Sequence, residues 1–197
     1  MAEKISIPDD VNPKAFFEEI IPKQFEATIA ENPPSNDLEG TEFSMQTDVD
    51  GPNGGSWAVI IKDGKSIEVK PEAYDKALIT LGVKENDWRD TVTGKLGPPM
   101  DFTQQVGGDQ AKSQLETLKG IHGTLIMEVK KADGYVISTK ITFNKAASPE
   151  TTLKMTLEDS IAMGEGKLDG QQAFMSGKLQ IEGDMMFAMQ LGSLRMM

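Results

Sequence analysis

The chain has no cysteine and only one histidine, and both scarcities narrow its chemistry. Without cysteine there is no disulfide, no thiolate nucleophile and no cysteine metal site. His122 has no second histidine with which to share a metal, and no Gly-x-Ser-x-Gly elbow is present. Because a catalytic base needs an oriented partner, we interpret His122 as a turn or surface residue. We expect no catalytic residue, no metal site and no cofactor.

Basic residues are also scarce, with 20 Lys and Arg against 31 Asp and Glu, a formal charge of −11 and a pI near 4.6. Nucleic acid is therefore not an expected partner, since binding phosphates needs clustered Lys and Arg. For the same reason, charge alone does not attract the chain to an anionic membrane.

Long apolar runs are missing as well, because none approaches the roughly eighteen residues of a membrane span. The N-terminal MAEKISIPDDVNPK carries acids where a signal peptide has its apolar core. We therefore expect a cytoplasmic protein. The C-terminal Leu194–Met197 lacks an address of the Ser-Lys-Leu type, so it gives no ground for a peroxisomal location.

Two segments resemble ligand-binding motifs, but each lacks one residue that its motif requires. Asp48–Gly54 superficially resembles a calcium loop, but Val59 stands where that loop requires a bidentate Glu. Gly64-Lys65-Ser66 looks like the end of a P-loop, yet Val59 again stands where the first glycine belongs. We interpret Asp48–Gly54 as a hairpin turn and expect no phosphate cradle at Gly64.

What is present is ordinary for a globular protein, with 38% apolar and 26% charged residues in 197, enough for one large domain or two small ones. Asn12 suits a helix N-cap with Pro13 at the first helical position. Apolar residues then recur at three- and four-residue spacing and predict one helix face: Phe16, Phe17, Ile20, Ile21, Phe25 and Ile29. Pro22 should kink or split this helix.

Alternating residues predict short strands over 43–49, 57–61 and 67–69, joined by Asp-Gly and Asn-Gly turns that suit tight hairpins. A fourth strand over 77–81 leads to a helix over 85–93, which closes in Gly94-Lys95-Leu96. Further strands are expected over 125–129, 136–143 and 152–157. After them come a capped helix, a Gly-punctuated turn, another apolar strand and a final apolar segment.

The second set of segments repeats the plan of the first, which indicates an internal duplication with a period of about 75 residues. Thr80-Leu81 corresponds to Thr156-Leu157, and Gly94-Lys95-Leu96 to Gly166-Lys167-Leu168. The copies are unequal, since the second has only 111–119 where the first has its long helix. Either two domains or one fused body is compatible with this pattern, and a half-repeat that cannot bury its sheet face alone favours the fused body.

Methionine is concentrated at the end of the chain. Eight of the twelve methionines follow residue 154: Met155, Met163, Met175, Met185, Met186, Met189, Met196 and Met197. Met is unbranched and polarisable, so such a cluster suits a cavity that accepts apolar ligands of varying shape. It equally suits the filling of an irregular core.

The segment from Thr152 to Leu194 resembles the type-2 sterol carrier protein family in the order of its motifs. These motifs are Thr156-Leu157-Glu158, Gly166-Lys167-Leu168, Gln172-Ala173-Phe174-Met175, Gly177-Lys178-Leu179 and Ile181-x-Gly183-Asp184. The resemblance implies a small α+β domain that holds fatty acyl chains, sterols or acyl-CoA in an apolar tunnel, without catalysis. The earlier segment, from the long helix that begins at Pro13 to Gly94-Lys95-Leu96, resembles the first two-thirds of the same family.

We accordingly expect an α+β fold with antiparallel strands in one or two curved sheets and helices packed on one face. The expected organisation is an N-terminal arm over 1–12, a first repeat over 13–110 and a second over 111–197. On the resemblance, the lipid-binding residues are Ile161, Met163, Phe174, Met175, Leu179, Met186, Phe187, Met189, Leu191 and Leu194.

Lys167 and Lys178 could meet a carboxylate or a CoA phosphate at the tunnel mouth, although such lysines commonly just solvate a surface. The expected partner is a lipid, with transient membrane contact and a homodimer as further possibilities. An alternative of another class is a protein interaction or assembly module on the same fold, in which the apolar ending packs as core or docks another chain.

Overall fold

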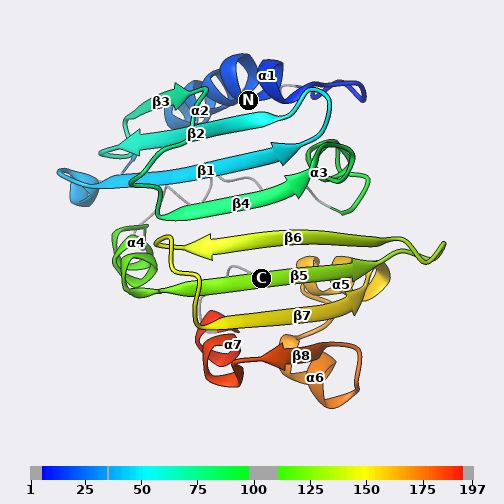
Figure 1. The fold of residues 1–197 in the computed structure, drawn as a ribbon. Coiled ribbons are helices and arrows are strands. Elements are labelled where there is room, and N and C mark those ends of the chain that lie inside the picture. Colours follow the sequence, from blue (N-terminus) through cyan, green and yellow to red (C-terminus); the bar gives the residue numbers. More distant parts are fainter. Residues whose placement is uncertain (1–5, 35, 98–110, 193–197) are drawn as a thin grey trace.

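The computed structural model describes residues 6–34, 36–97 and 111–192 (Figure 1). Its eight strands form one sheet in the order β3-β2-β1-β4-β6-β5-β7-β8. The strands are β1 Glu42–Asp50, β2 Gly55–Lys62, β3 Ser66–Lys70, β4 Ile79–Lys84, β5 Gly123–Lys130, β6 Val136–Phe143, β7 Glu150–Thr156 and β8 Gln180–Gly183.

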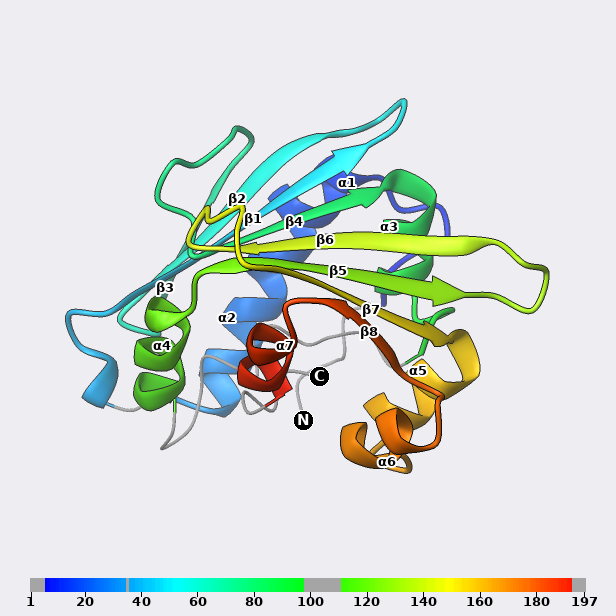
Figure 2. The same cartoon turned by 60° about the horizontal axis from the view of Figure 1, so that its bottom comes forward.

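Helices pack on one face of this sheet, as Figure 2 shows for α2, α4, α5, α6 and α7. The helical elements are α1 Pro13–Ala15, the π-helix η1 Phe16–Ile20, α2 Ile21–Glu31, the 3-10 helix η2 Asn36–Leu38, α3 Glu85–Val92, α4 Ala111–Gly120, α5 Leu157–Gly164, α6 Gly170–Met175 and α7 Met185–Gly192. The predicted α+β class is thereby confirmed. No helix in the described residues is long and apolar enough to cross a membrane.

The sheet is mixed, which corrects the expectation of antiparallel strands alone. β1 pairs in parallel with β4, and β5 pairs in parallel with β7, while the other pairs are antiparallel. Each parallel pair forms because a later strand returns beside the first strand of a hairpin, on the edge that the hairpin leaves free. Local periodicity carries no information on which edge is used.

The N-terminal helix follows its sequence signals. The Asn12 side chain accepts a hydrogen bond from the Ala15 N–H at 2.9 Å, and Pro13 takes the first helical position. Ahead of Pro22 the helix widens into the π turn η1, and the Ile21 N–H donates to the Phe16 carbonyl, five residues back. Pro22 therefore interrupts the helix, as predicted, because it has no N–H to continue the α-helical ladder.

Aromatic side chains fill the core of the first half. Phe17 stacks on Trp57 with ring centroids 5.4 Å apart, and Phe16 meets the edge of Trp88 at 5.3 Å. These four rings are almost fully buried between the helices and strands β1 and β2. Such rings contribute large buried areas together with specific ring contacts, so this part of the inner face is filled by the chain itself.

Aliphatic side chains form the core of the second half. Its buried members lie mainly on β4 to β7 and in the C-terminal segment, with Met45 on β1 and Leu118 on α4, and they include Ile79, Leu125, Ile137, Phe143, Leu153, Met155, Leu179, Phe187 and Leu191. Phe43 of β1 packs against both cores. The two cores therefore meet beneath one continuous sheet.

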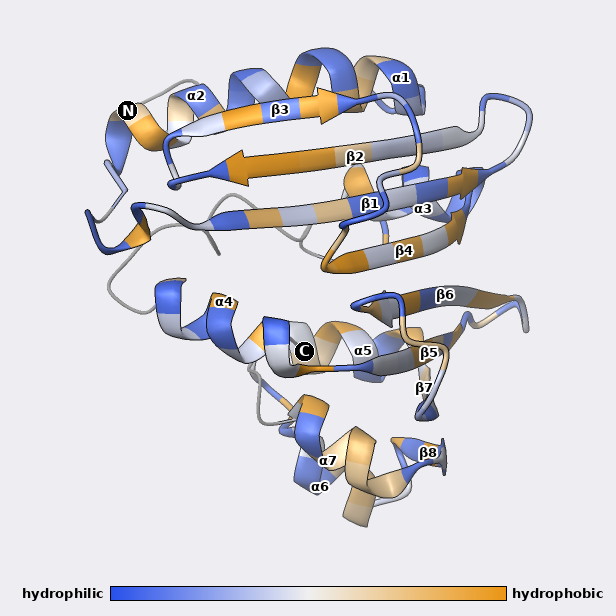
Figure 3. Ribbon diagram, turned by 60° about the vertical axis from the view of Figure 1, so that its left-hand side comes forward, coloured by the Kyte–Doolittle hydropathy of each residue, from blue (hydrophilic) through white to orange (hydrophobic). Residues whose placement is uncertain are grey.

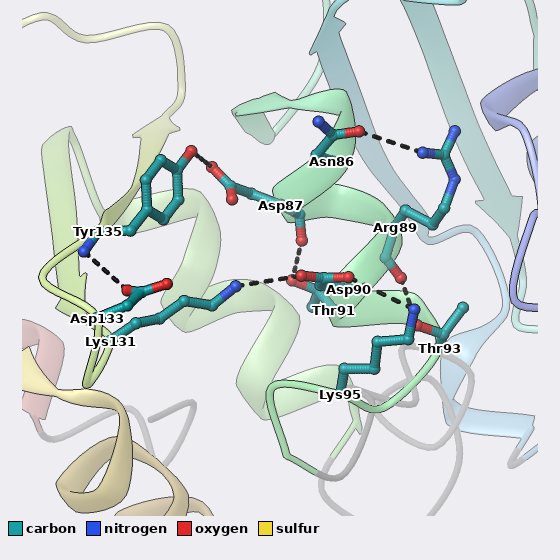
Figure 4. Close-up of polar contacts among 10 residues, drawn as sticks. All are labelled: Asn86, Asp87, Arg89, Asp90, Thr91, Thr93, Lys95, Lys131, Asp133 and Tyr135. Carbon is teal, nitrogen blue, oxygen red and sulfur yellow. Dashed lines mark hydrogen bonds and ion pairs between the residues drawn. The ribbon is translucent and has the colours of Figure 1, made fainter.

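The two halves join where β4 pairs with β6, from Ile79 opposite Phe143 to Gly82 opposite Lys140. Beyond that ladder, side chains of α3 and of the β5–β6 turn connect the halves (Figure 4). The Tyr135 hydroxyl donates to Asp87 at 2.9 Å, and Lys131 Nζ lies 3.2 Å from an Asp90 carboxylate oxygen. The hydrogen bond to Asp87, together with desolvation, raises the pKa of Tyr135.

Candidate functional site

The two Gly-Lys-Leu motifs of the C-terminal segment form the same turn at the ends of α5 and α6. Gly166 and Gly177 take positive φ angles of 70° and 75°. The next two N–H groups then donate to one helical carbonyl, that of Ala162 after Gly166 and that of Ala173 after Gly177. Because only glycine adopts this conformation without strain, the motif encodes a helix end, and the leucine folds back toward the core.

Both lysines of these motifs pair with acids of the chain. Lys167 Nζ lies 2.7 Å from Glu165, and Lys178 Nζ lies 2.9 Å from Asp159. The Asp159 side chain is 13% exposed whereas that of Lys178 is 52% exposed. A ligand headgroup that approached Lys178 would therefore compete with a carboxylate already in place.

Thr156 and Asp159 begin α5 as reciprocal caps. The Asp159 N–H donates to the Thr156 hydroxyl at 3.1 Å, and that hydroxyl donates to the Asp159 carboxylate at 2.7 Å. The hydrogen bond from Thr156, and then the one from Lys178, lowers the pKa of Asp159. The same pair raises the pKa of Lys178. The ion pair of Asp159 and Lys178 therefore links α5 to the turn between α6 and β8.

The Ile181-x-Gly183-Asp184 motif attaches β8 and α7 to β7. A Cβ at Gly183, where φ is 91°, would lie 2.5 Å from the Glu150 carbonyl oxygen. Asp184 accepts the Phe187 N–H through its side chain at 2.8 Å and so caps α7. The glycine of this motif therefore allows the end of β8 to approach the start of β7 closely, and the aspartate then caps α7.

Phe187 anchors α7 to the sheet. It is 2% exposed and packs edge-on against Phe143, with ring centroids 6.4 Å apart. A Cβ at Gly123 would lie only 2.6 Å from the Phe187 ring. The absence of a side chain at Gly123 thus permits the close approach of α7 to β5.

The predicted lipid-binding residues divide by exposure. Leu179, Phe187 and Leu191 are buried in the core of the second half, and Ile161 and Met163 are half-buried. The others in the described part of the chain lie at the surface: Phe174 is 46%, Met175 79%, Met186 82% and Met189 71% exposed. Leu194 lies outside the described residues. Five of the nine described residues are thus buried or half-buried and four are exposed, and all of them stay candidates.

The exposed methionines form a stripe on α7. Met185, Met186 and Met189 stand at helical spacing on the side opposite Phe187 and Leu191. Figure 3 shows the hydrophobic colouring of this helix. Because α7 has no charged residue, its sequence could not reveal which face would be buried.

Further candidates come from the strands. Half-buried apolar residues of the strands pack against the same core, and they include Phe43, Leu81, Met127 and Ile141. The period-2 pattern of the strands could have drawn attention to them. The concentration of methionine in the last quarter of the sequence favours the C-terminal segment instead.

His122 is exposed, with Nδ1 3.2 Å from the Gly120 carbonyl oxygen, in agreement with its interpretation as a turn residue. In the part of the chain that the structure describes, no group of three or more His, Cys, Asp or Glu side chains could hold a metal ion. The described geometry is thus one of apolar packing and helix capping.

Comparison with known proteins identifies a family over the second half. The SCP-2 sterol transfer family matches residues 103–195. Sterol carrier protein 2 of Rattus norvegicus is 33% identical over 96 residues, which are 49% of this chain and 17% of that protein. The oleate-induced peroxisomal protein POX18 of Candida maltosa is 28% identical over 90 residues, 41% of this chain and 70% of that protein.

Among solved structures, the apo form of sterol carrier protein 2 from Yarrowia lipolytica shares 25% identity, with 41% of this chain and 78% of that chain covered and a TM-score of 0.34. Sterol carrier protein 2 like 2 from Aedes aegypti shares 22% identity, with 43% and 94% covered and a TM-score of 0.32. The chain spans less than a fifth of the length of the sterol carrier protein 2 relatives that it matches. The similarity to the SCP-2 sterol transfer family thus extends over residues 103–195, just under half of the chain.

Proposed function

We propose that the protein is a non-catalytic lipid carrier that holds fatty acyl chains, sterols or acyl-CoA in an apolar space between its sheet and its helices. The observation that carries the proposal is the family match over residues 103–195. Half-buried apolar side chains on the inner face of the second half support it. Affinity would come mainly from burial of aliphatic surface, at about 25 cal/mol per Å² before the costs of association.

The charged groups have a secondary role in this proposal. Lys167 and Lys178 remain candidates for the headgroup, although both already pair with acids. A headgroup contact would be an exposed ion pair, and such pairs contribute little affinity. A cytoplasmic location also stays a prediction, because one relative carries a peroxisomal name.

Native mass spectrometry of protein purified without detergent tests the carrier function. We expect a co-purifying lipid, or a mass increase of one lipid per bound site after incubation of delipidated protein with palmitic acid, palmitoyl-CoA or cholesterol. A variant at an exposed position outside the candidate residues, Val136→Asp, serves as a control for nonspecific adsorption to the surface, and its uptake should match that of the unaltered protein if the ligand lies inside. An unshifted mass with all three lipids would contradict the proposal.

A second candidate function, an interaction module, is favoured by the exposed methionine stripe on α7. A second copy of the chain could cover this uncharged face and form the homodimer considered above. Sedimentation velocity at increasing concentration should then show dimers that Met186→Asp with Met189→Asp abolishes. Strictly monomeric behaviour of the unaltered protein would remove this candidate.

A further inference from the structure

Among the described residues on the inner face of the sheet, those where the two halves meet are less deeply buried than their neighbours. In the middle of the three strands at this junction, five residues that face the helical layer are only half-buried: Leu81 and Val83 on β4, Thr139 and Ile141 on β6, and Met127 on β5. We call these five residues the seam patch. Residues next to it along the same strands are buried, among them Ile79, Phe143 and Ile137.

The strand register places the seam patch on one face. Leu81 lies opposite Ile141, and Thr139 lies opposite Met127. Ile141 also lies opposite Leu125, which is buried in the core of the second half. Because side chains alternate between faces along a strand, all of these residues point toward the helices, and Ser138 and Lys140 point away.

The two halves separate beside this patch. The ladder between β4 and β6 ends at Gly82 opposite Lys140, although β4 continues to pair with β1 as far as Lys84 and β6 with β5 as far as Val136. Figure 1 shows the two strands diverging toward α3. Val83 and Thr139 therefore flank a stretch without pairing between the halves, and the Tyr135–Asp87 and Lys131–Asp90 contacts close its far end (Figure 4).

The surroundings of the seam patch are apolar. Leu157 and Met163 of α5, and Leu96 after α3, are partly buried and pack against the same core. Thr139 contributes the one polar side chain among the five patch residues, and none of the five is charged. Met127 and Met163 are flexible and polarisable, so they can adapt to ligands of different shape.

The width of the seam patch fits one hydrocarbon chain. From β4 across β6 to β5 there are two strand spacings, about 10 Å in all. This span is at the lower limit of the diameter of an α-helix with its side chains, about 10 to 12 Å. It exceeds the width of a single extended aliphatic chain, so one such chain can lie along the strands on the patch.

We propose that the seam patch binds the aliphatic chain of a fatty acid at the junction of the two half-sheets. This inference rests on the proposed carrier function and places the ligand against β4, β6 and β5, and not along the exposed faces of α6 and α7. The site exists only because β4 of the first half pairs with β6 of the second. Each half then supplies part of the lining.

Adjacent residues of β6 provide a matched test. Thr139→Trp fills the patch from the inner face, whereas Ser138→Trp adds the same side chain on the opposite face, where Ser138 is exposed. With palmitic acid as the probe, we expect Thr139→Trp to weaken binding by about tenfold or more and Ser138→Trp to leave it unchanged. Thr139→Val, which preserves size and removes the hydroxyl, should bind at least as tightly as the unaltered protein.

Photolabelling of the unaltered protein with a diazirine-bearing palmitic acid keeps the inference testable if Thr139→Trp fails to fold. Labels on the peptides of β4, β5 and β6 are the expected result. Labels confined to α6 and α7, or equal affinity of the two tryptophan variants, would overturn the seam site and leave the carrier function standing. Failure of the unaltered protein to bind palmitic acid, palmitoyl-CoA or cholesterol would overturn both.

Discussion

Replacement of Phe187 by alanine is expected to lower the free energy of unfolding by about 3 to 5 kcal/mol, the usual cost of removing a buried aromatic ring. The ring is 2% exposed, packs against Phe143 and fills the space left by the missing side chain of Gly123. The neighbouring Met186→Ala is the control, because Met186 is 82% exposed. Its effect should stay within about 0.5 kcal/mol, as for most surface substitutions.

The same substitution tests whether the two halves form one cooperative body, which we propose from the continuous sheet. Both tryptophans, Trp57 and Trp88, lie in the aromatic core of the first half, whereas Phe187 lies in the core of the second. In urea unfolding, tryptophan fluorescence reports the first half and circular dichroism at short wavelength reports the whole chain. In one cooperative body, Phe187→Ala shifts both transitions together.

An unchanged tryptophan transition, beside a weakened transition in circular dichroism, would show two independently unfolding units. That result would favour the division into segments 13–110 and 111–197 as separate domains. An equal shift for Met186→Ala and Phe187→Ala would instead contradict the role of Phe187 as the anchor of α7.

Local chemistry explains why much of the secondary structure could be predicted from the sequence. The Asn12 cap, the hairpins between β1, β2 and β3, and the start of α3 at Glu85 all depend on residues close together in the chain. Leu157 was expected at the end of a strand, but it begins α5 because Thr156 caps that helix. One capping hydroxyl decided that boundary.

The arrangement of the halves could not be predicted, because strand pairing depends on which edges remain free after each half has formed. β4 has a free edge that β6 occupies, whereas β7 pairs at its corresponding edge with β8. Nothing in the local pattern of Ile79–Lys84 distinguishes these outcomes. The candidate site depends on the same long-range pairing, since Leu81 and Ile141 meet only across this junction.

The duplication remains a proposal, and two structural correspondences support it. In parallel registers, Met45 lies opposite Ile79 in the first half and Leu125 opposite Thr151 in the second. Both copies also end a helix with a glycine of positive φ followed by a lysine. The Lys95 N–H after Gly94 donates to the Asp90 carbonyl, and the Lys167 N–H after Gly166 donates to the Ala162 carbonyl. Such equivalent turns are expected if one unit was duplicated and the N-terminal helix of the second copy was later shortened.

Acidification is expected to weaken the fold through Glu85, a carboxylate that is almost fully buried. It accepts hydrogen bonds from the Asn53 side chain at 3.0 Å, from the Asn53 backbone at 2.9 Å and from Arg89 at 2.6 Å. The Asn53 side chain first, then its backbone N–H and Arg89, lowers the pKa of Glu85 despite burial. The charged form therefore joins α3 to the β1–β2 turn.

The sign of the pH dependence follows from the lowered pKa. The unfolded chain binds the proton more readily than the folded one, so the stabilisation is complete above the unfolded pKa of about 4.3. It is lost as the pH falls from there through the folded pKa. Glu85→Gln leaves one acceptor facing the same donors, and at neutral pH it should cost about 3 kcal/mol.

Urea unfolding of the unaltered protein and Glu85→Gln at several pH values measures this effect. The difference in free energy of unfolding should be constant at neutral pH and should shrink as the pH falls below about 4.3. Glu26→Gln, at an exposed position of α2, is the matched control and should show little difference at any pH. A Glu85→Gln difference that persists unchanged in acid would mean that the charge of Glu85 does not hold α3 to the β1–β2 turn.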